Sequence, residues 1–238
     1  MAYATRGGKG CTLRLRFGVP DTAHNPYAAL QIPNFRRYIL GLLAFTMAIQ
    51  IQGTVVGWQI YELTHDKLAL GLIGLAEALP FISLSLYAGH VADRHDRRRT
   101  ALIALSVLFC CSVALMVLPR FLTTAPQQVV RAIYGVIVVS GFARSFLQPA
   151  RQALGAEIVP RALYSNAITW RSGAWQLAAV IGPALGGVLY AIGGAQLAYS
   201  VDVALMLVGI GGYAMMRHKS NSRRQTRTDF LGVITFDF

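Results

Sequence analysis

Three charged side chains stand two turns or more inside long apolar stretches of this 238-residue sequence or near one end of them without a flanking cluster, where an isolated charge is costly. Glu77 is either a carboxyl group satisfied by a neighbouring helix or a group that takes up and releases a proton near neutral pH, and we expect it to be a coupling proton site. Arg144 either holds an anionic group or extends to the cytoplasmic headgroups, and the second interpretation is favoured. Asp202 is expected to lie near the outer membrane boundary.

Small and polar residues in the first apolar stretch form one helical face at about 100° per residue. This face contains Thr46, Gln50, Gly53, Thr54 and Gly57. It is either the wall of a water-filled cavity or a seam where small residues let two helices approach. The candidate residues of a cavity and proton path are Gln50, Thr54, Glu77 and Arg144.

A charged connection follows the second apolar stretch and reads Gly-His-Val-Ala-Asp-Arg-His-Asp-Arg-Arg-Arg over residues 89–99. Acidic and Arg side chains at helix ends make charge-assisted bonds that are strong yet break on rearrangement. A plain stop-transfer cluster would explain the arginines but not the glycine and the first aspartate. We therefore predict a conformational latch made of Gly89, Asp93, Arg94, Asp96, Arg97 and Arg98.

The fifth apolar stretch carries a Gly-Pro segment that predicts a bent helix with a close-contact face. Gly182 and Gly186 are one turn apart, and Ala178 extends the same stripe of small residues. Pro183 removes one backbone hydrogen bond and bends the helix. The predicted gate helix is defined by Gly182, Pro183, Gly186 and Gly187.

The elements that position these residues follow from composition. Hydrophobic residues make up 55% of the chain and charged residues 13%, against about 25% charged in soluble domains. A membrane-spanning helix needs about 20 apolar residues, and six runs approach that length. They are 38–61, 68–91, 100–118, 129–147, 168–192 and 196–216. The sequence predicts an all-α integral membrane protein with six transmembrane helices.

Lys and Arg gather at both ends of the chain and in the second and fourth connections, whereas the odd-numbered connections hold Lys67, Arg120 and Arg131. The positive-inside rule then predicts that both termini are cytoplasmic. The expected domains are a basic tail (1–37), a six-helix bundle (38–216) and a second cytoplasmic tail (217–238). This distribution explains the net charge of +12 without nucleic acid as a partner.

Motifs of catalysis and cofactor binding are not found in the sequence. The histidines lack metal-ligand spacing, and no phosphate-binding Gly-rich loop with Lys and Ser or Thr occurs. No nucleophile has a motif context. We therefore expect no enzymatic activity, no catalytic residues, no cofactor and no metal.

Taken together, the motifs resemble the major facilitator superfamily. Residues 89–98 are similar to its signature Gly-x-x-x-Asp-Arg-x-Gly-Arg-Arg between helices two and three, with Asp96 in place of the second Gly. Over about residues 34–216 the chain also resembles the enterobactin exporter-like branch. The motifs that carry this resemblance occur in the expected order and are Asn34-Phe-Arg-Arg37, Trp58-Gln-Ile-Tyr-Glu-Leu-Thr64, Asp93-Arg-His-Asp-Arg-Arg-Arg99, Pro149-Ala-Arg-Gln-Ala153 and Gly182-Pro-Ala-Leu-Gly-Gly187.

The resemblance implies an exporter of small organic molecules, such as siderophores or drugs, in the bacterial inner membrane. The Gly-Pro segment is similar to the fifth-helix antiporter motif, with Ala178 in place of its leading Gly, and this implies proton coupling. Family members have two six-helix halves, of which this chain matches the first. The expected partners are the lipid bilayer, a small-molecule substrate, protons, and a missing second half or a second copy, and truncation is the favoured explanation. The alternative is a non-transporting membrane subunit or an inactive truncated product.

Overall fold

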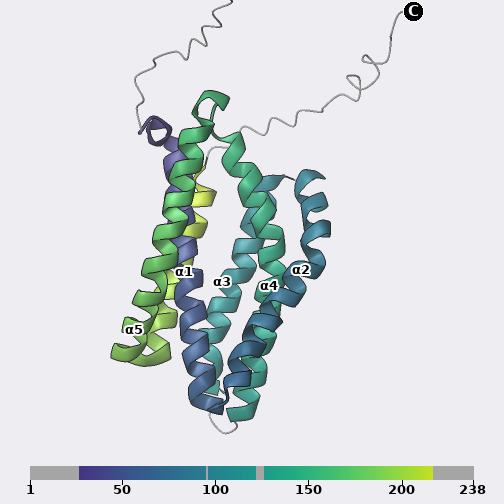
Figure 1. Cartoon of the computed structure of the whole chain (residues 1–238), viewed down its shortest axis with the longest axis vertical. Coiled ribbons are helices and arrows are strands. Elements are labelled where there is room, and N and C mark those ends of the chain that lie inside the picture. Colours follow the sequence, from purple (N-terminus) through teal and green to yellow (C-terminus); the bar gives the residue numbers. More distant parts are fainter. Residues whose placement is uncertain (1–26, 95, 122–125, 217–238) are drawn as a thin grey trace, which may run out of the picture.

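The computed structural model describes residues 27–94, 96–121 and 126–216, and its long elements are all helices. They form an elongated bundle in which the helices run along the long axis (Figure 1). The elements in chain order are η1 (Ala29–Gln31), α1 (Pro33–Thr64), α2 (Lys67–Arg94), α3 (Arg97–Phe121), α4 (Pro126–Glu157), η2 (Arg161–Leu163) and α5 (Tyr164–Ala214). The predicted tail 217–238 and most of the predicted tail 1–37 lie outside the described residues.

The helix α1 begins five residues before the first apolar run. Pro33 occupies its first turn, where a missing backbone N–H costs nothing because that group has no helical partner. Arg36 and Arg37 therefore belong to the helix and not to a tail. The helix ends at His65, whose left-handed backbone (φ 52°) lets its N–H bond the carbonyl of Tyr61 at 2.8 Å.

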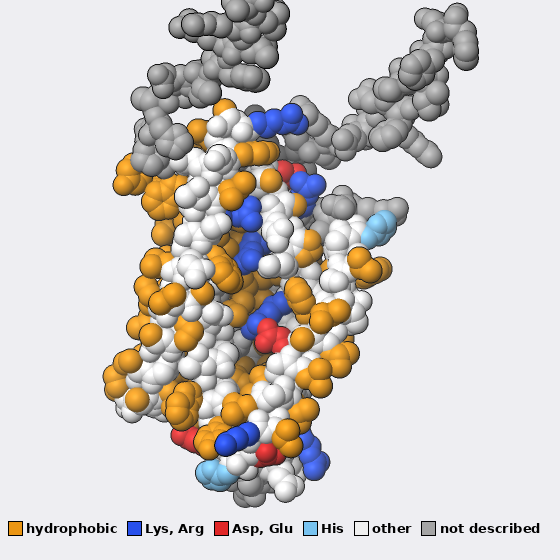
Figure 2. All heavy atoms as spheres, in the orientation of Figure 1, with side chains coloured by type: hydrophobic (Ala, Val, Ile, Leu, Met, Phe, Trp, Pro, Cys, Tyr) orange, Lys and Arg blue, Asp and Glu red, His pale blue; other side chains and the backbone are white. Residues whose placement is uncertain are grey.

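All five helices are long and apolar enough to cross a membrane. The 32 residues of α1 extend about 48 Å at 1.5 Å per residue, which exceeds a hydrocarbon core about 30 Å thick. Large apolar side chains cover much of the exterior (Figure 2). On α2, Leu68 and Leu86 are 76% and 89% exposed. Such a surface is suited to lipid and not to water.

The helix α5 contains 51 residues, and only Gly193 and Gly194 leave helical geometry within it. Gly194 has φ 62°, a conformation that favours glycine. The two arms run in opposite directions along α1. In the first arm Gly182 lies against Gln50 and Gly186 against Ile51 and Thr54, whereas in the second arm Gly209 lies against Phe45 and Gly212 against Gly41.

The sequence predicts six separate helices, and the structure has five over the described residues. The difference lies at 193–195, where two glycines reverse the chain without an intervening loop, so the predicted fifth and sixth runs are arms of one element. Elsewhere the helices match the predicted runs and extend past them. For example, α4 continues ten residues beyond Leu147 and passes Pro149.

Candidate functional site

An ion pair joins α2 to α4 inside the bundle. Nη1 of Arg144 donates to Oε1 of Glu77, and the side chains are 19% and 36% exposed. Gly141, one turn before the arginine, makes this approach possible: a Cβ there would lie 2.7 Å from the carbonyl oxygen of Glu77 and from Cγ of Pro80. Gly141 is a positioning residue that the sequence prediction did not include in the site.

The pairing overturns the expectation that Arg144 extends to the headgroups. A guanidinium group that finds a carboxylate in a region of low dielectric gains more from pairing than from a long reach to the interface. The sequence could not show that Glu77 and Arg144, 67 residues apart, face each other.

A second polar contact leads from Arg144 deeper into the bundle. Nη2 of Arg144 is 3.5 Å from Oε1 of Gln52, and Nε2 of Gln52 donates to Oγ of Ser112 at 3.1 Å. Gln52 is 4% exposed and Ser112 is 0% exposed. The chain of contacts therefore connects α2, α4, α1 and α3. The sequence prediction did not include Gln52 in the site. The signal that could have found it is its polar amide within an apolar run, although Gln52 lies off the predicted cavity face.

Asp202, in the second arm of α5, is wholly buried, with 0% exposure. Among the described residues neither carboxyl oxygen has a partner that meets hydrogen-bond geometry, although the hydroxyl of Ser112 and the charge of Arg144 lie near enough to favour its charged form. The expectation that it lies at the outer boundary is wrong. Because the second arm of α5 packs back against the bundle, the helix turns this side chain inward rather than towards the interface.

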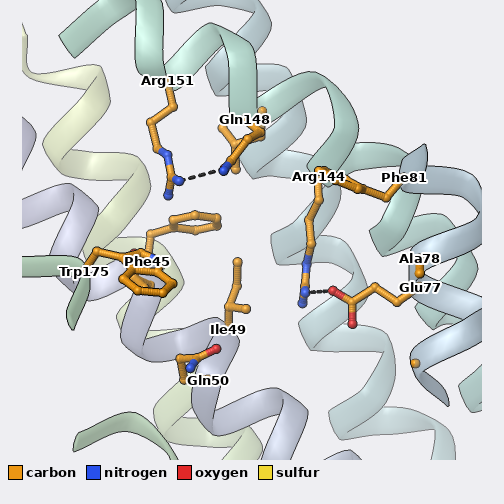
Figure 3. A pocket seen from close by; sticks show the side chains of 13 residues that line it. Phe45, Ile49, Gln50, Glu77, Ala78, Phe81, Arg144, Gln148, Arg151 and Trp175 are labelled. Carbon is orange, nitrogen blue, oxygen red and sulfur yellow. Dashed lines mark hydrogen bonds and ion pairs between the residues drawn. The ribbon is translucent and has the colours of Figure 1, made fainter. Parts of the chain in front are cut away.

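A cleft of about 360 Å³ opens beside the ion pair (Figure 3). Among the predicted cavity residues, it brings together Gln50, Glu77 and Arg144. Thr54 lies elsewhere: its hydroxyl donates to the carbonyl of Gln50 at 3.0 Å, and its side chain lines a separate, largely apolar hollow. Aromatic rings also line the cleft, contributed by Phe45, Phe81 and Trp175.

A second hollow of about 600 Å³ shares Gln148, Arg151 and Trp175 with the cleft and adds Arg171. In Figure 3, Arg144 and Arg151 extend from α4 towards the cleft, and Nη2 of Arg151 donates to Oε1 of Gln148 at 2.7 Å. Figure 2 shows basic side chains one above another along this face, with an acidic side chain beside them. We call the two connected hollows the arginine groove. Arg151 and Arg171 are groove residues that the sequence prediction missed.

The predicted latch residues in the structure stabilise helix ends. Oδ1 of Asp96 accepts from the backbone N–H of Arg98 at 3.0 Å, which caps the start of α3. Arg97 pairs with Glu157 of α4 at 2.6 Å, and Nε of Arg98 donates to the carbonyl of Tyr213 at 3.4 Å near the end of α5. The partners of Asp96, Arg97 and Arg98 therefore include groups within this same bundle.

The remaining latch positions are Gly89, Asp93 and Arg94. The side chains of Asp93 and Arg94 lie outside the described residues. A Cβ added at Gly89 would meet nothing within 4 Å, so the surface there is open.

The predicted gate helix is the first arm of α5, and its small residues divide between two sides. A Cβ at Gly182 would lie 2.5 Å from Cβ of Gln50, so this glycine packs directly on α1. Gly186 packs on α1 one turn later, against Ile51. Pro183 is half-buried, and a Cβ at Gly187 would meet nothing within 4 Å. The close-contact face is therefore used within this chain.

In the described part of the chain, no group of three or more His, Cys, Asp or Glu side chains is placed to hold a metal ion. The arrangement instead offers guanidinium groups and aromatic faces in an apolar surround, which suits an organic anion.

Apolar helices around a charged cleft define a multi-pass membrane protein with room for a small molecule. The family described as "Transmembrane secretion effector" (MFS_3) matches residues 24–236. The chain therefore belongs to this family of the major facilitator superfamily, which confirms the resemblance found in the sequence.

Curated relatives give the branch. The chain is 30% identical to the enterobactin exporter EntS of Citrobacter koseri over 180 residues, which cover 72% of this chain and 40% of the relative. It has the same identity to EntS of Salmonella typhimurium, covering 72% and 41%. It is 28% identical to the staphyloferrin A transporter of Staphylococcus aureus over 137 residues, covering 58% and 34%.

The chain thus spans less than half the length of these relatives. No solved structure matches it. The names of these relatives describe export and transport.

Proposed function

We propose that this chain forms one six-span half of a proton-coupled exporter of small organic anions in the bacterial inner membrane. The two arms of α5 would each cross the bilayer, which gives six crossings and leaves both termini in the cytoplasm. The match to siderophore exporters and transporters supports this function. The chain would work by alternating access, in which one bundle rocks against another around a central site.

The observation that carries the proposal is the arginine groove. Arg144, Arg151 and Arg171 place guanidinium groups along one hollowed face, and Trp175 and Phe45 add aromatic surface beside them. Guanidinium groups bind carboxylate oxygens as planar forks and stack on aromatic rings. A siderophore with carboxylate or catechol groups combines both chemistries, so we assign enterobactin-type and staphyloferrin-type molecules as the substrate class.

A groove open on one face needs a second wall. A second six-helix bundle would supply it, from a second copy of this chain, another polypeptide or a longer form of the same chain. Gly89 and the outward-facing Gly187 leave open surface where such a bundle could approach. In this arrangement the latch around Asp93 would stabilise one end state. Replacing Asp93 by Asn should then reduce transport while leaving membrane insertion intact, and full transport by that variant would remove the latch.

Everted membrane vesicles from cells that make the 238-residue chain test the function. Respiration acidifies the vesicle lumen, and uptake of radiolabelled iron-free enterobactin and staphyloferrin A is measured. We expect uptake above that of vesicles without the chain, abolished by a protonophore. The double variant Arg151→Gln/Arg171→Gln should reduce uptake at least tenfold, whereas Arg161→Gln, at an exposed position of η2, should not.

Binding of the same two molecules to the purified chain in nanodiscs separates the remaining possibilities. Binding without uptake would show that the chain holds the site and that a second bundle is required. Absence of both binding and uptake would contradict the proposal and favour the alternative of a non-transporting subunit or an inactive product.

A further inference from the structure

The charges inside the bundle do not balance if every acid is ionised. Arg144 supplies one positive charge, while Glu77 and Asp202 supply two carboxyl groups. Glu77 is paired with the arginine and faces the cleft, where its side chain is 36% exposed. Asp202 is wholly buried and has no hydrogen-bond partner. One more proton in this cluster makes it neutral.

Asp202 is the group that holds the extra proton most easily. A buried charge without a partner costs several kcal/mol, and such a group becomes neutral instead. Glu77, by contrast, is paired with the guanidinium group of Arg144 and faces the cleft. The two acids share one cation, so their protonation states are coupled.

The groups around Asp202 come from three helices and include two that could bind its carboxylate. From α3, Ser112 accepts the amide of Gln52, which leaves its own hydroxyl hydrogen free to turn towards the carboxyl group. Within α5, Tyr199 donates its hydroxyl to Oε1 of Gln59 of α1 at 2.7 Å. From α4, the positive charge of Arg144 acts on the carboxyl group without a direct hydrogen bond to it.

The remaining titratable groups act on Asp202 through Arg144. Glu77 of α2 pairs with the guanidinium group, and Cys111 of α3 lies close enough to interact with it. The Nε atom of Arg144 has no hydrogen-bond partner. The guanidinium group therefore keeps an unused donor while it is bound to Glu77 and Gln52.

We propose that Asp202 is the proton-binding site of this bundle and that Arg144 moves between Glu77 and Asp202 as the proton leaves and returns. With Asp202 protonated, Arg144 pairs with Glu77 and the cleft contains a neutral pair, as in this structure. When the proton leaves to water, the new carboxylate attracts Arg144, and Glu77 is released at the wall of the arginine groove. The coupling to transport rests on the proposed function, whereas the protonation of Asp202 does not.

Infrared spectroscopy of the full chain in nanodiscs tests the protonation directly. A protonated carboxylic acid has a C=O stretching band separate from the carboxylate bands. We expect such a band at neutral pH in the wild-type chain, its retention in Glu77→Gln, and its loss in Asp202→Asn. Circular dichroism verifies that each variant is folded, and Asn imitates the size and neutrality of the protonated acid.

Two results would overturn the proposal. One is the absence of the band from the wild-type chain, and the other is a band that survives in Asp202→Asn and disappears in Glu77→Gln. Arg144→Gln, made in the Glu77→Gln background so that Glu77 cannot contribute a band, provides a further test. Because it removes the cation that would stabilise the carboxylate of Asp202, the band should persist to higher pH, and an unchanged or lowered titration range would contradict the role of Arg144.

Transport measurements address the coupling separately. In everted vesicles, Asp202→Asn should abolish uptake driven by the proton gradient while preserving exchange of labelled for unlabelled substrate. Gradient-driven uptake at the wild-type rate would refute the coupling. If the wild-type chain shows no uptake at all, the proposed function fails while the infrared result still decides where the proton is bound.

Discussion

The helices α1 and α2 are equally hydrophobic, but they occupy opposite environments in the bundle. Over their most apolar segments, 61% of α1 is buried against other helices and only 11% of α2 is. Close backbone contacts account for the difference. Along α1, Gly41 meets glycines of α5, and the backbones come into direct contact. Along α2, bulky side chains such as Leu86 point outward. In a membrane, small residues and polar contacts decide which helices pack, because lipid satisfies apolar surfaces as well as protein does.

The largest effect is expected at the contact between α1 and the first arm of α5. Replacing Gly182 by Leu places a Cβ 2.5 Å from Cβ of Gln50, so the two helices must separate. We expect a loss of about 3 kcal/mol or more in the free energy of unfolding. Thermal unfolding in nanodiscs, followed by circular dichroism, measures the change.

Gly187 is the matched control for this prediction, because a Cβ there meets nothing within 4 Å. The variant Gly187→Leu should stay within about 0.5 kcal/mol of the wild type in the free energy of unfolding. Equal stability of the two variants would show that the close contact of α1 with α5 does not hold the bundle together.

A smaller loss is expected where α2 meets α4. Replacing Gly141 by Ala forces a methyl group to within 2.7 Å of the carbonyl oxygen of Glu77 and of Cγ of Pro80. We expect a loss of about 2 kcal/mol in the free energy of unfolding, together with a weakened Glu77–Arg144 pair. Gly135→Ala on the same helix meets no neighbour and should be close to neutral. Stability equal to that of Gly135→Ala would mean that α2 does not depend on this contact.

The ion pair at the helix ends should contribute less. Arg97 and Glu157 are 32% and 41% exposed, so water and salt screen their attraction. We expect Arg97→Gln to lower the free energy of unfolding by no more than about 1 kcal/mol. Repeating the measurement at high salt should reduce the difference, and a larger, salt-independent loss would indicate a structural role beyond pairing.

The smallest effect is expected on the outward face of α2. Leu86 is 89% exposed within the bundle, so Leu86→Ala removes no internal packing. We expect a change below about 0.5 kcal/mol in the free energy of unfolding. By comparison, Leu105→Ala empties a wholly buried position of α3 and should cost about 2 to 5 kcal/mol. A large effect of Leu86→Ala would indicate that another protein surface, and not lipid, covers α2.

Several features of the site were predictable from one-dimensional patterns. The apolar runs located the helices, because crossing a bilayer requires a minimum length. Glu77 and Arg144 were identified because charges in such runs are rare, and Gln50 because polar residues repeated on one helical face. Gly182 and Gly186 were identified as a contact face by their spacing of one turn.

The incorrect predictions concern which side of a helix faces which neighbour. Arg144 was expected at the headgroups and is paired with Glu77, and Asp202 was expected at the boundary and is wholly buried. Arg151 and Arg171 belong to the groove, although in the sequence Arg151 follows one apolar run and Arg171 lies near the start of the next, where flanking charges are ordinary. Position along a run fixes depth in the membrane but not rotation about the helix axis.

The sequence alone determined that this chain has long apolar runs suited to crossing a membrane and that it belongs with the major facilitator superfamily, because both conclusions depend on local composition and on the order of short motifs. Only the tertiary structure decided that α5 folds back on α1 and that Arg144 of α4 pairs with Glu77 of α2. Those outcomes depend on contacts between residues far apart in the chain. Single glycines set how closely two backbones approach, and small differences in that distance control such contacts. Hydropathy contains no record of them.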